Sequence, residues 1–134
     1  MHSEEKSHSS KTRFMKKVVI IEDDEAINDI LTIILRNGGY SVSSVNRGEL
    51  VTYSDTELPD LFLIDKNLPG IDGITICREI KANPATQHIP VVMISANHSF
   101  TRPASAAGAD ACIPKPFSRQ ELLTTIEHLV GDKA

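Results

Sequence analysis

The sequence predicts an α/β domain in which a five-stranded parallel sheet is covered by helices on both faces. Short, continuous apolar runs alternate along the chain with segments whose apolar residues recur at helical spacing. Strict alternation of strands and helices favours parallel pairing, with the connecting helices packed on both sides of the sheet. The 134 residues, 40% of them hydrophobic, suffice for one compact domain.

Five segments are predicted to be strands. "KVVII" (17–21), "DLFLID" (60–65) and "PVVMIS" (90–95) are continuous apolar runs rich in branched residues, which is typical of strands buried on both faces. "SVSSV" (41–45) alternates in polarity and is expected nearer an edge of the sheet. "ACIP" (111–114) is short, and its proline is tolerated most easily at a strand end or an edge.

The first predicted helix follows the first strand. Its apolar residues recur at i, i+3, i+4, i+7 and i+8 and make one stripe, formed by Ile27, Ile30, Leu31, Ile34 and Leu35. Asp24 and Glu25 are interpreted as caps or dipole partners at its start. The sequence "NGG" (37–39) supplies a stop signal.

The remaining helices are predicted from sequence patterns of different strength. One starts near Asp72 and is marked by Ile74, Cys77 and Ile80. The last is marked by Leu122, Ile126, Leu129 and Val130, with Ser118 and Glu121 as a capping box. A weaker helix is expected over 48–54.

The segment 97–109 should hold a fourth helix, yet Pro103 lies in its middle. Because proline breaks a helix interior but fits a first turn, this helix is predicted to be short and to begin near Arg102. With an apolar pattern that is mostly alanine, it is expected to be the least stable part of the domain.

Charge and composition separate a tail from a domain. Residues 1–15 read as a disordered tail or a remnant of cloning, residues 16–131 as the domain, and residues 132–134 as a short C-terminal tail. Fourteen basic and eighteen acidic residues give a net charge of −4, and this acidic balance argues against direct nucleic-acid binding. Cys77 and Cys112 are isolated in apolar patterns, so buried free thiols are expected.

No apolar run approaches the roughly 18 residues of a membrane span, and the N-terminal segment is polar where a secretory signal would be apolar. A cytoplasmic protein without membrane contact is therefore predicted.

Charged and hydroxyl side chains follow four of the strands. They are Glu22 and Asp23, Asp65, Ser95, and Lys115. In an open parallel sheet ligands bind beyond the carboxyl ends of the strands, so these side chains are expected to meet there. Taken one at a time, Glu22, Asp23 and Asp65 could each be a helix or turn cap.

Together these residues suit phosphate chemistry assisted by a metal ion. Carboxylates from two strands offer the hard oxygen ligands that Mg²⁺ prefers. A cation would lower the pKa of Asp65 and leave its carboxylate able to act as a nucleophile. The Lys115 ammonium and the Ser95 hydroxyl could then bind oxygens of a phosphoryl group on Asp65.

Four stretches, in this order and nearly this spacing, resemble the receiver domain of two-component response regulators. They are "VVIIEDDEAI" (18–27), "LFLIDKNLPGIDG" (61–73), "VVMISAN" (91–97) and "DACIPKPF" (110–117). The resemblance covers about residues 16 to 131. It implies the flavodoxin-like (CheY-like) (βα)5 three-layer sandwich.

The resemblance also implies a role for each site residue. Asp65 would be the phosphoacceptor, and the acidic pair Glu22 and Asp23 would hold Mg²⁺, with the backbone carbonyl of Asn67 as a further ligand. Ser95 stands at the family's hydroxyl position and Lys115 at its invariant lysine, with a cis peptide expected between Lys115 and Pro116.

Two departures from the family concern its switch. The position three residues before the lysine usually holds an aromatic side chain but is Cys112 here. The stretch from Ser95 to Lys115 is about two residues short. A small thiol cannot fill the space left when Ser95 moves toward a phosphoryl group, so the family's coupling between the hydroxyl and an aromatic side chain is not expected here. The short stretch, together with Pro103, predicts that the face made by helix four, strand five and helix five, a possible homodimer surface, is atypical.

The leading hypothesis is a signalling receiver that is an enzyme only toward its own phosphorylation and dephosphorylation. A histidine kinase or histidine phosphotransfer protein would be the donor, an unknown downstream protein would be the target, and Asn67 and Asn97 would tune the lifetime of the phosphoryl group. One alternative is a degenerate receiver that binds a protein without phosphorylation. Another is a Mg²⁺-dependent phosphohydrolase, which the sequence disfavours because Asn67 cannot act as acid or base.

Overall fold

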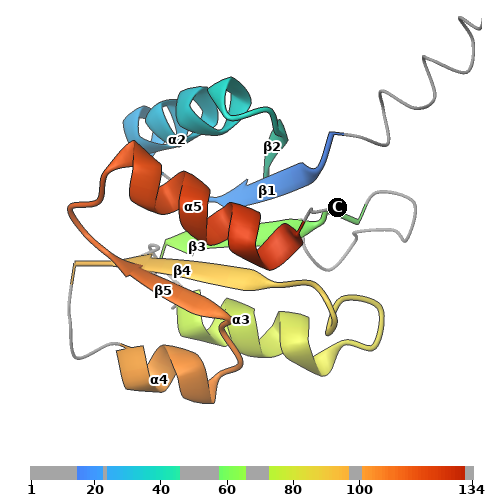
Figure 1. Cartoon of the computed structure of the whole chain (residues 1–134). Coiled ribbons are helices and arrows are strands. Elements are labelled where there is room, and N and C mark those ends of the chain that lie inside the picture. The colour runs from blue at the N-terminus through green and yellow to red at the C-terminus, as the bar shows by residue number, and fades with distance from the viewer. Residues whose placement is uncertain (1–14, 23, 46–57, 66–72, 97–100, 132–134) are drawn as a thin grey trace, which may run out of the picture.

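The computed structural model describes residues 15–22, 24–45, 58–65, 73–96 and 101–131. Its centre is a parallel sheet of five strands in the order β2-β1-β3-β4-β5 (Figure 1). The strands are β1 (Lys17–Ile21), β2 (Ser41–Val45), β3 (Leu61–Asp65), β4 (Val91–Ser95) and β5 (Ala111–Pro114). The predicted fold class is confirmed, and the alternating β2 and the proline-ended β5 are the two edge strands.

The helices cover both faces of the sheet. They are α2 (Glu25–Asn37), α3 (Gly73–Ala82), α4 (Thr101–Ala106) and α5 (Arg119–Val130). Figure 1 shows α2 and α5 on one face and α3 and α4 on the other. None of the helices in the described ranges is long and apolar enough to cross a membrane, and the predicted helix over 48–54 lies outside those ranges.

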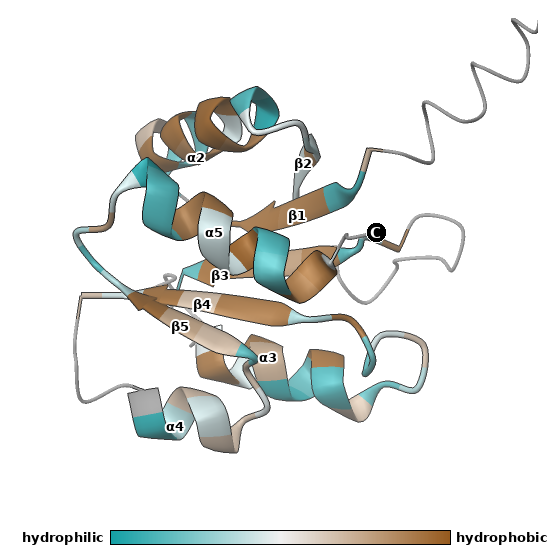
Figure 2. Ribbon diagram, in the orientation of Figure 1, coloured by the Kyte–Doolittle hydropathy of each residue, from teal (hydrophilic) through white to brown (hydrophobic). Residues whose placement is uncertain are grey.

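Two hydrophobic clusters hold the three layers together, one on each face of the sheet (Figure 2). Along β3, Leu61 and Leu63 face the cluster beneath α2 and α5, whereas Phe62 and Ile64 face the cluster above α3 and α4. Both clusters are nearly free of solvent. The three inner strands β1, β3 and β4 are continuous apolar runs because their side chains on both faces enter a core.

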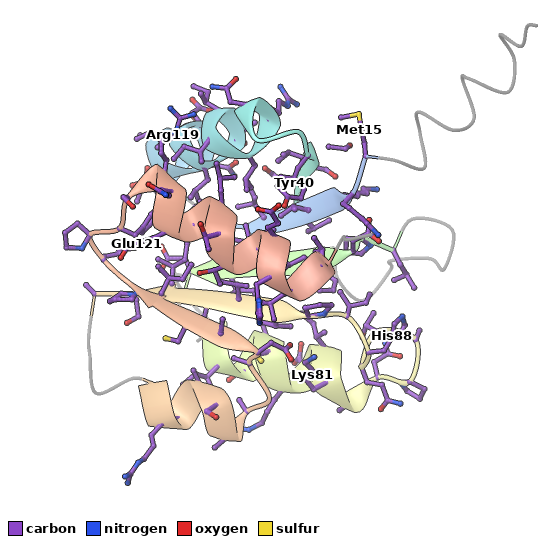
Figure 3. The ribbon with its side chains drawn as sticks, in the orientation of Figure 1. Met15, Tyr40, Lys81, His88, Arg119 and Glu121 are labelled. Atoms are coloured by element: carbon purple, nitrogen blue, oxygen red, sulfur yellow. The ribbon has the colours of Figure 1, made fainter. Side chains whose placement is uncertain are left out.

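The ends of two helices follow the predicted cap signals. The Asp24 carboxylate accepts hydrogen bonds from the N–H groups of Ala26 and Ile27 at 2.9 and 3.1 Å. Ser118 and Glu121 form the predicted capping box at the start of α5, whose first turn is labelled in Figure 3. The turn after α2 uses Gly39 at a φ of 96°, a conformation that glycine adopts without strain.

The apolar face of α2 is wider than the core requires. Leu31 and Leu35 are buried, and Ile27 and Ile34 are half-buried. Ile30, which the sequence pattern assigns to the same stripe, is 56% exposed. The stripe therefore continues past the core onto the surface of the domain.

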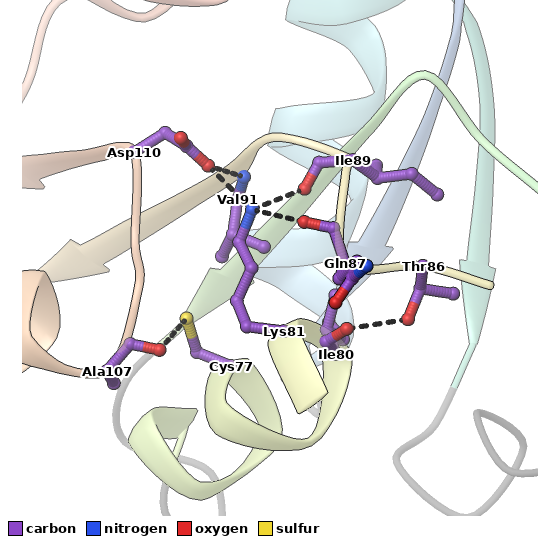
Figure 4. Close-up of polar contacts among 9 residues, drawn as sticks. All are labelled: Cys77, Ile80, Lys81, Thr86, Gln87, Ile89, Val91, Ala107 and Asp110. Atoms are coloured by element: carbon purple, nitrogen blue, oxygen red, sulfur yellow. Dashed lines mark hydrogen bonds and ion pairs between the residues drawn. The ribbon is translucent and has the colours of Figure 1, made fainter. Parts of the chain in front are cut away.

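Helix α4 is short, as predicted, and Pro103 is its third residue. The segment that follows α4 is tied to α3 and β4 (Figure 4). The Lys81 ammonium donates to the carbonyls of Ile89 (2.8 Å) and Gln87 (3.3 Å) and pairs with Asp110 at 3.1 Å. Asp110 also accepts the N–H of Val91 at 2.8 Å.

The prediction of buried free thiols is right for Cys77 and wrong for Cys112. Both cysteines are free, but Cys112 is only half-buried because β5 lies at the edge of the sheet and α4 is short. Burial raises the pKa of the Cys77 thiol to about 11, and that thiol donates to the Ala107 carbonyl at 3.6 Å.

Candidate functional site

The carboxyl ends of β1, β3, β4 and β5 lie along one edge of the sheet. Glu22 directly follows β1, Asp65 ends β3, Ser95 ends β4, and Lys115 follows β5. The strand order places β3 between β1 and β4, so Asp65 stands at the middle of this group. All four side chains come from segments that the sequence predicts to converge here.

The strongest contact at this edge joins Lys115 and Asp65. The ammonium lies 3.1 Å from Oδ2 of the carboxylate, and the Asp65 side chain is only 6% exposed. The backbone N–H of Lys115 donates to the Ser95 carbonyl at 2.8 Å, which fixes the start of this connection against β4. The peptide bond between Lys115 and Pro116 is cis, as predicted.

Glu22 is buried beside Asp65 and has little hydrogen bonding. Its Oε2 accepts the N–H of Asp24 at 3.0 Å, whereas Oε1 is buried and has no hydrogen-bond partner among the described residues. Burial, followed by the neighbouring Asp65 carboxyl, raises the pKa of Glu22 to about 7, although the Asp24 N–H and the Lys115 ammonium act in the opposite direction. Two carboxylates offer each other no donor, so Glu22 and Asp65 can hydrogen-bond only when they share a proton.

The described part of the site has more acidic than basic groups. There, one ammonium lies near two buried carboxyl groups, and the Glu22 Oε1 atom, which has no hydrogen-bond partner, is an acceptor that a cation would satisfy. Within the described ranges there is no group of three or more acidic, histidine or cysteine side chains that could hold a metal ion. Asp23, Asn67 and Asn97, which the sequence also assigns to this site, lie outside those ranges.

Ser95 is buried at 1% exposure, at the end of the strand next to β3. Cys112 belongs to the same region but not to this edge, because it pairs with Met93, two residues before Ser95. It lines one hollow between β5 and α5 and another between α4 and β5, with volumes of about 450 and 170 Å³.

An apolar groove beside the site has no counterpart in the sequence-based predictions. It lies between α2 and the connection after β5 and has a volume of about 550 Å³. Its walls include Ile27, Ile30 and Ile34 on one side and Lys115, Pro116 and Phe117 on the other. The sequence offered one sign of it, because α2 has more apolar residues than the core buries, including Ile33 at 59% exposure.

A role for Asn28 of α2 was not predicted from the sequence either. Its side-chain amide bonds to the Glu22 carbonyl and to hydroxyl groups of Thr32 and Ser44. A single asparagine in a helix carries no pattern that would reveal these contacts.

Comparison with known proteins agrees with this geometry. Residues 18–127 match the family model of the response regulator receiver domain. The chain is 33% identical over 119 residues to the phosphate regulon transcriptional regulatory protein PhoB of Rhizobium meliloti, covering 87% of this chain and 52% of PhoB. It spans about half the length of the curated relatives it matches.

Solved structures show the same fold. A protein from Chloroflexus aurantiacus described as a response regulator superposes with a TM-score of 0.81 at 30% identity, covering 87% of this chain and 98% of that one. The receiver domain of the sensor histidine kinase PA1611 from Pseudomonas aeruginosa, which has a magnesium ion coordinated in its active-site cleft, gives 0.78 at 26% identity, covering 88% and 99%. The chain belongs to the response regulator receiver domain family of two-component signalling.

Proposed function

We propose that Asp65 accepts a phosphoryl group from a phosphohistidine and that the modified domain then changes its binding to a downstream protein. The donor would be a histidine kinase or a histidine phosphotransfer protein, and the domain, residues 16–131 between two short tails, would act in the cytoplasm. The observation that carries this proposal is the 3.1 Å pair between Lys115 and a nearly buried Asp65 at the carboxyl edge of the sheet.

The chemistry follows from the positions of three side chains. A carboxylate oxygen of Asp65 attacks the phosphorus, the P–N bond breaks, and its electron pair stays on the imidazole nitrogen. The Lys115 ammonium, already at Oδ2, neutralises oxygens of the transferred group, and the Ser95 hydroxyl donates to another of them. Hydrolysis of the acyl phosphate would return the domain to its starting state, with Asn67 and Asn97 tuning the rate.

Mg²⁺ fits the charge that the site lacks. The unpaired buried oxygen of Glu22 and the adjacent Asp65 are suitable ligands, and we assign Asp23 and the Asn67 carbonyl to the same ion. When bound, Mg²⁺ would neutralise negative charge on the carboxylates and on the incoming phosphoryl group. The magnesium in the cleft of the related Pseudomonas aeruginosa receiver supports this assignment.

The groove beside the site suits a protein donor. Its walls are mostly apolar, and Lys115 belongs both to the groove and to the ion pair with Asp65. A helical segment packed on Ile30 and Ile34 could therefore present a phosphohistidine to Asp65. The face made by α4, β5 and α5 stays a candidate surface for a homodimer.

The test is to treat the protein with acetyl phosphate and Mg²⁺ and to measure its intact mass. We expect a gain of one phosphoryl group, lost in Asp65→Asn and retained in Asp60→Asn, a matched control directly before the start of the same strand. Persistence of the gain in Asp65→Asn would refute the assignment of Asp65.

A degenerate receiver that binds its partner without phosphorylation is the second candidate. The observation that favours it is Cys112, half-buried between two hollows where the family usually has an aromatic side chain. If the unaltered chain gains no mass and binds beryllofluoride no more tightly with Mg²⁺ than without, this second candidate is correct.

A further inference from the structure

We propose that Asn28 is a positioning residue that holds Glu22, directly after β1, in the geometry needed for Mg²⁺. The inference rests on the proposed function, because it concerns the same metal site. It assigns to a residue of α2, outside the predicted set of ligands, control over the affinity of that site.

Asn28 joins three elements through one side chain. Its Oδ1 accepts hydrogen bonds from the hydroxyl groups of Ser44 on β2 (2.8 Å) and Thr32 on α2 (3.3 Å). Its Nδ2 donates to the backbone carbonyl of Glu22 at 3.4 Å. The end of β1, the first turns of α2 and the end of β2 therefore meet at this amide.

The two hydroxyl groups fix the orientation of the amide. Since both hydroxyls donate to Oδ1, the N–H₂ group is directed to the Glu22 carbonyl, an acceptor. Ser44 pairs with Ile20 in the sheet, so its hydrogen bond to Asn28 fixes where Asn28 lies along the end of β1. Neither a carboxylate nor an apolar side chain at position 28 could make this set of three contacts.

The Glu22 carbonyl belongs to the peptide group that joins Glu22 to Asp23. A hydrogen bond to that carbonyl restricts the backbone of Glu22 and thus the direction in which the Glu22 side chain leaves it. On its other side the loop is fixed by the Asp24 N–H, which donates to Glu22 Oε2 at 3.0 Å. Asn28 also donates its own backbone N–H to the Asp24 carbonyl at 2.9 Å, so it holds the loop at two points.

Groups that orient metal ligands typically change metal affinity by about 10- to 100-fold when removed. The contact to the Glu22 carbonyl is long at 3.4 Å, so we expect the lower end of this range. The rate with saturating Mg²⁺ should change little, because Asn28 touches neither Asp65 nor Lys115 in the hydrogen bonds of the structure.

The experiment compares Asn28→Leu with the unaltered protein after removal of metal with a chelator. Calorimetric titration with Mg²⁺ should give a dissociation constant about tenfold higher in the variant. The Mg²⁺ concentration for half-maximal phosphorylation by acetyl phosphate should rise by the same factor, with the maximal rate within about twofold. Asn28→Ala, which breaks the same contacts with a good helix former, serves as a second variant if leucine is not tolerated.

Thr86→Val is the matched control. It removes a buried hydrogen bond of 2.7 Å to the Ile80 carbonyl, at the opposite edge of the sheet, and should lower stability without changing Mg²⁺ affinity. A dissociation constant of the Asn28 variants within twofold of the unaltered protein would overturn the inference, as would a lower maximal rate with unchanged Mg²⁺ dependence. Failure of the unaltered protein to bind Mg²⁺ would instead refute the proposed metal site, and the role of Asn28 with it.

Discussion

Among the residues that the structure describes, one ammonium lies near two buried carboxyl groups at the carboxyl ends of the strands. Lys115 lies at Asp65, while Glu22 has a buried oxygen with no donor and a pKa raised to about 7. Burial of a carboxylate without a partner costs free energy, which is the reason that its proton is held more tightly. In its ionised form Glu22 therefore lowers the stability of the folded domain.

This cost predicts that Glu22→Gln stabilises the metal-free protein at alkaline pH. The pKa of Glu22 is higher in the folded state, at about 7, than its ordinary value of 4.5. Stability from this group is therefore fully present below pH 4.5 and is lost as the pH rises through 7. A neutral amide avoids the loss, so urea unfolding in EDTA should show a gain of about 1–2 kcal/mol at pH 8 and little at pH 5.

Glu79→Gln, the same chemical change at an exposed residue of α3, supplies the control and should leave the free energy of unfolding nearly unchanged at both pH values. An equal effect of Glu22→Gln at both pH values would show that the carboxyl group of Glu22 is not destabilised by its surroundings.

The sequence predicted the described site residues but not their supporting contacts. Glu22, Asp65, Ser95 and Lys115 each adjoin the end of an apolar run, and parallel strands bring such ends together whatever the details of packing. The role of Asn28 depends on the register of β2 against β1, which places Ser44 within 2.8 Å of its amide. That register is a tertiary property and leaves no local pattern in the sequence.

At the scale of elements, the short α4 is held at its C-terminal end by α3. The Lys81 ammonium satisfies two carbonyls of the connection before β4 and pairs with Asp110, which starts the approach to β5 (Figure 4). Gly108 packs directly on this lysine, since a Cβ added there would lie 2.8 Å from Lys81 Cγ. The contact compensates for the few apolar side chains that α4 itself can bury.

Lys81→Met should therefore loosen the start of β5. Methionine keeps the apolar stem but removes the ammonium that donates to two carbonyls and pairs with Asp110, which retains the Val91 N–H as a donor. We expect a loss of about 1–2 kcal/mol in urea unfolding, a modest value because the Asp110 side chain is 37% exposed. Hydrogen exchange should quicken at the amide of Asp110, which donates to the Val91 carbonyl.

Arg78→Met, an exposed substitution on the same helix, should leave both measurements unchanged. If Lys81→Met unfolds at the same urea concentration as the unaltered protein, the lysine contributes no net stability and the anchor is unimportant.

Elements with a strong local pattern were predicted well, whereas the solvent exposure of individual side chains on them was predicted less well. The five strands, the capping box of α5 and the short α4 follow from local chemistry. The exposure of Ile30 and the half-burial of Cys112 were not predicted, because each depends on how much of an element its neighbours cover. Because β5 is an edge strand and α4 is short, Cys112 stays partly exposed to solvent, although its apolar neighbours in the sequence predicted burial.

At the scale of the whole molecule, segments that are far apart in the sequence form the site and its groove. Asp65 and Lys115 are 50 residues apart, and the groove unites α2 with the connection between β5 and α5. Ile30 in the wall of the groove is 56% exposed, whereas exposed Met15 lies beside the start of β1 (Figure 3). Apolar exposure next to a charged site is typical of a surface that binds another protein.

Ile30→Asp should consequently slow transfer from a protein donor but not from a small one. A charge in the groove opposes the burial of an apolar partner, and removing one well-buried contact typically costs more than about 1 kcal/mol of binding, or roughly fivefold in affinity. Acetyl phosphate needs no such contact, so its rate of phosphorylating Asp65 should stay the same.

Transfer from a phosphorylated histidine kinase domain, followed by gel or intact mass, measures the slowing with a protein donor. Met15→Asp, before the start of β1, should change neither the rate with the kinase nor the rate with acetyl phosphate. Equal slowing with both donors would mean that Ile30 supports the chemistry of the site, and no slowing with the kinase would place the docking surface elsewhere.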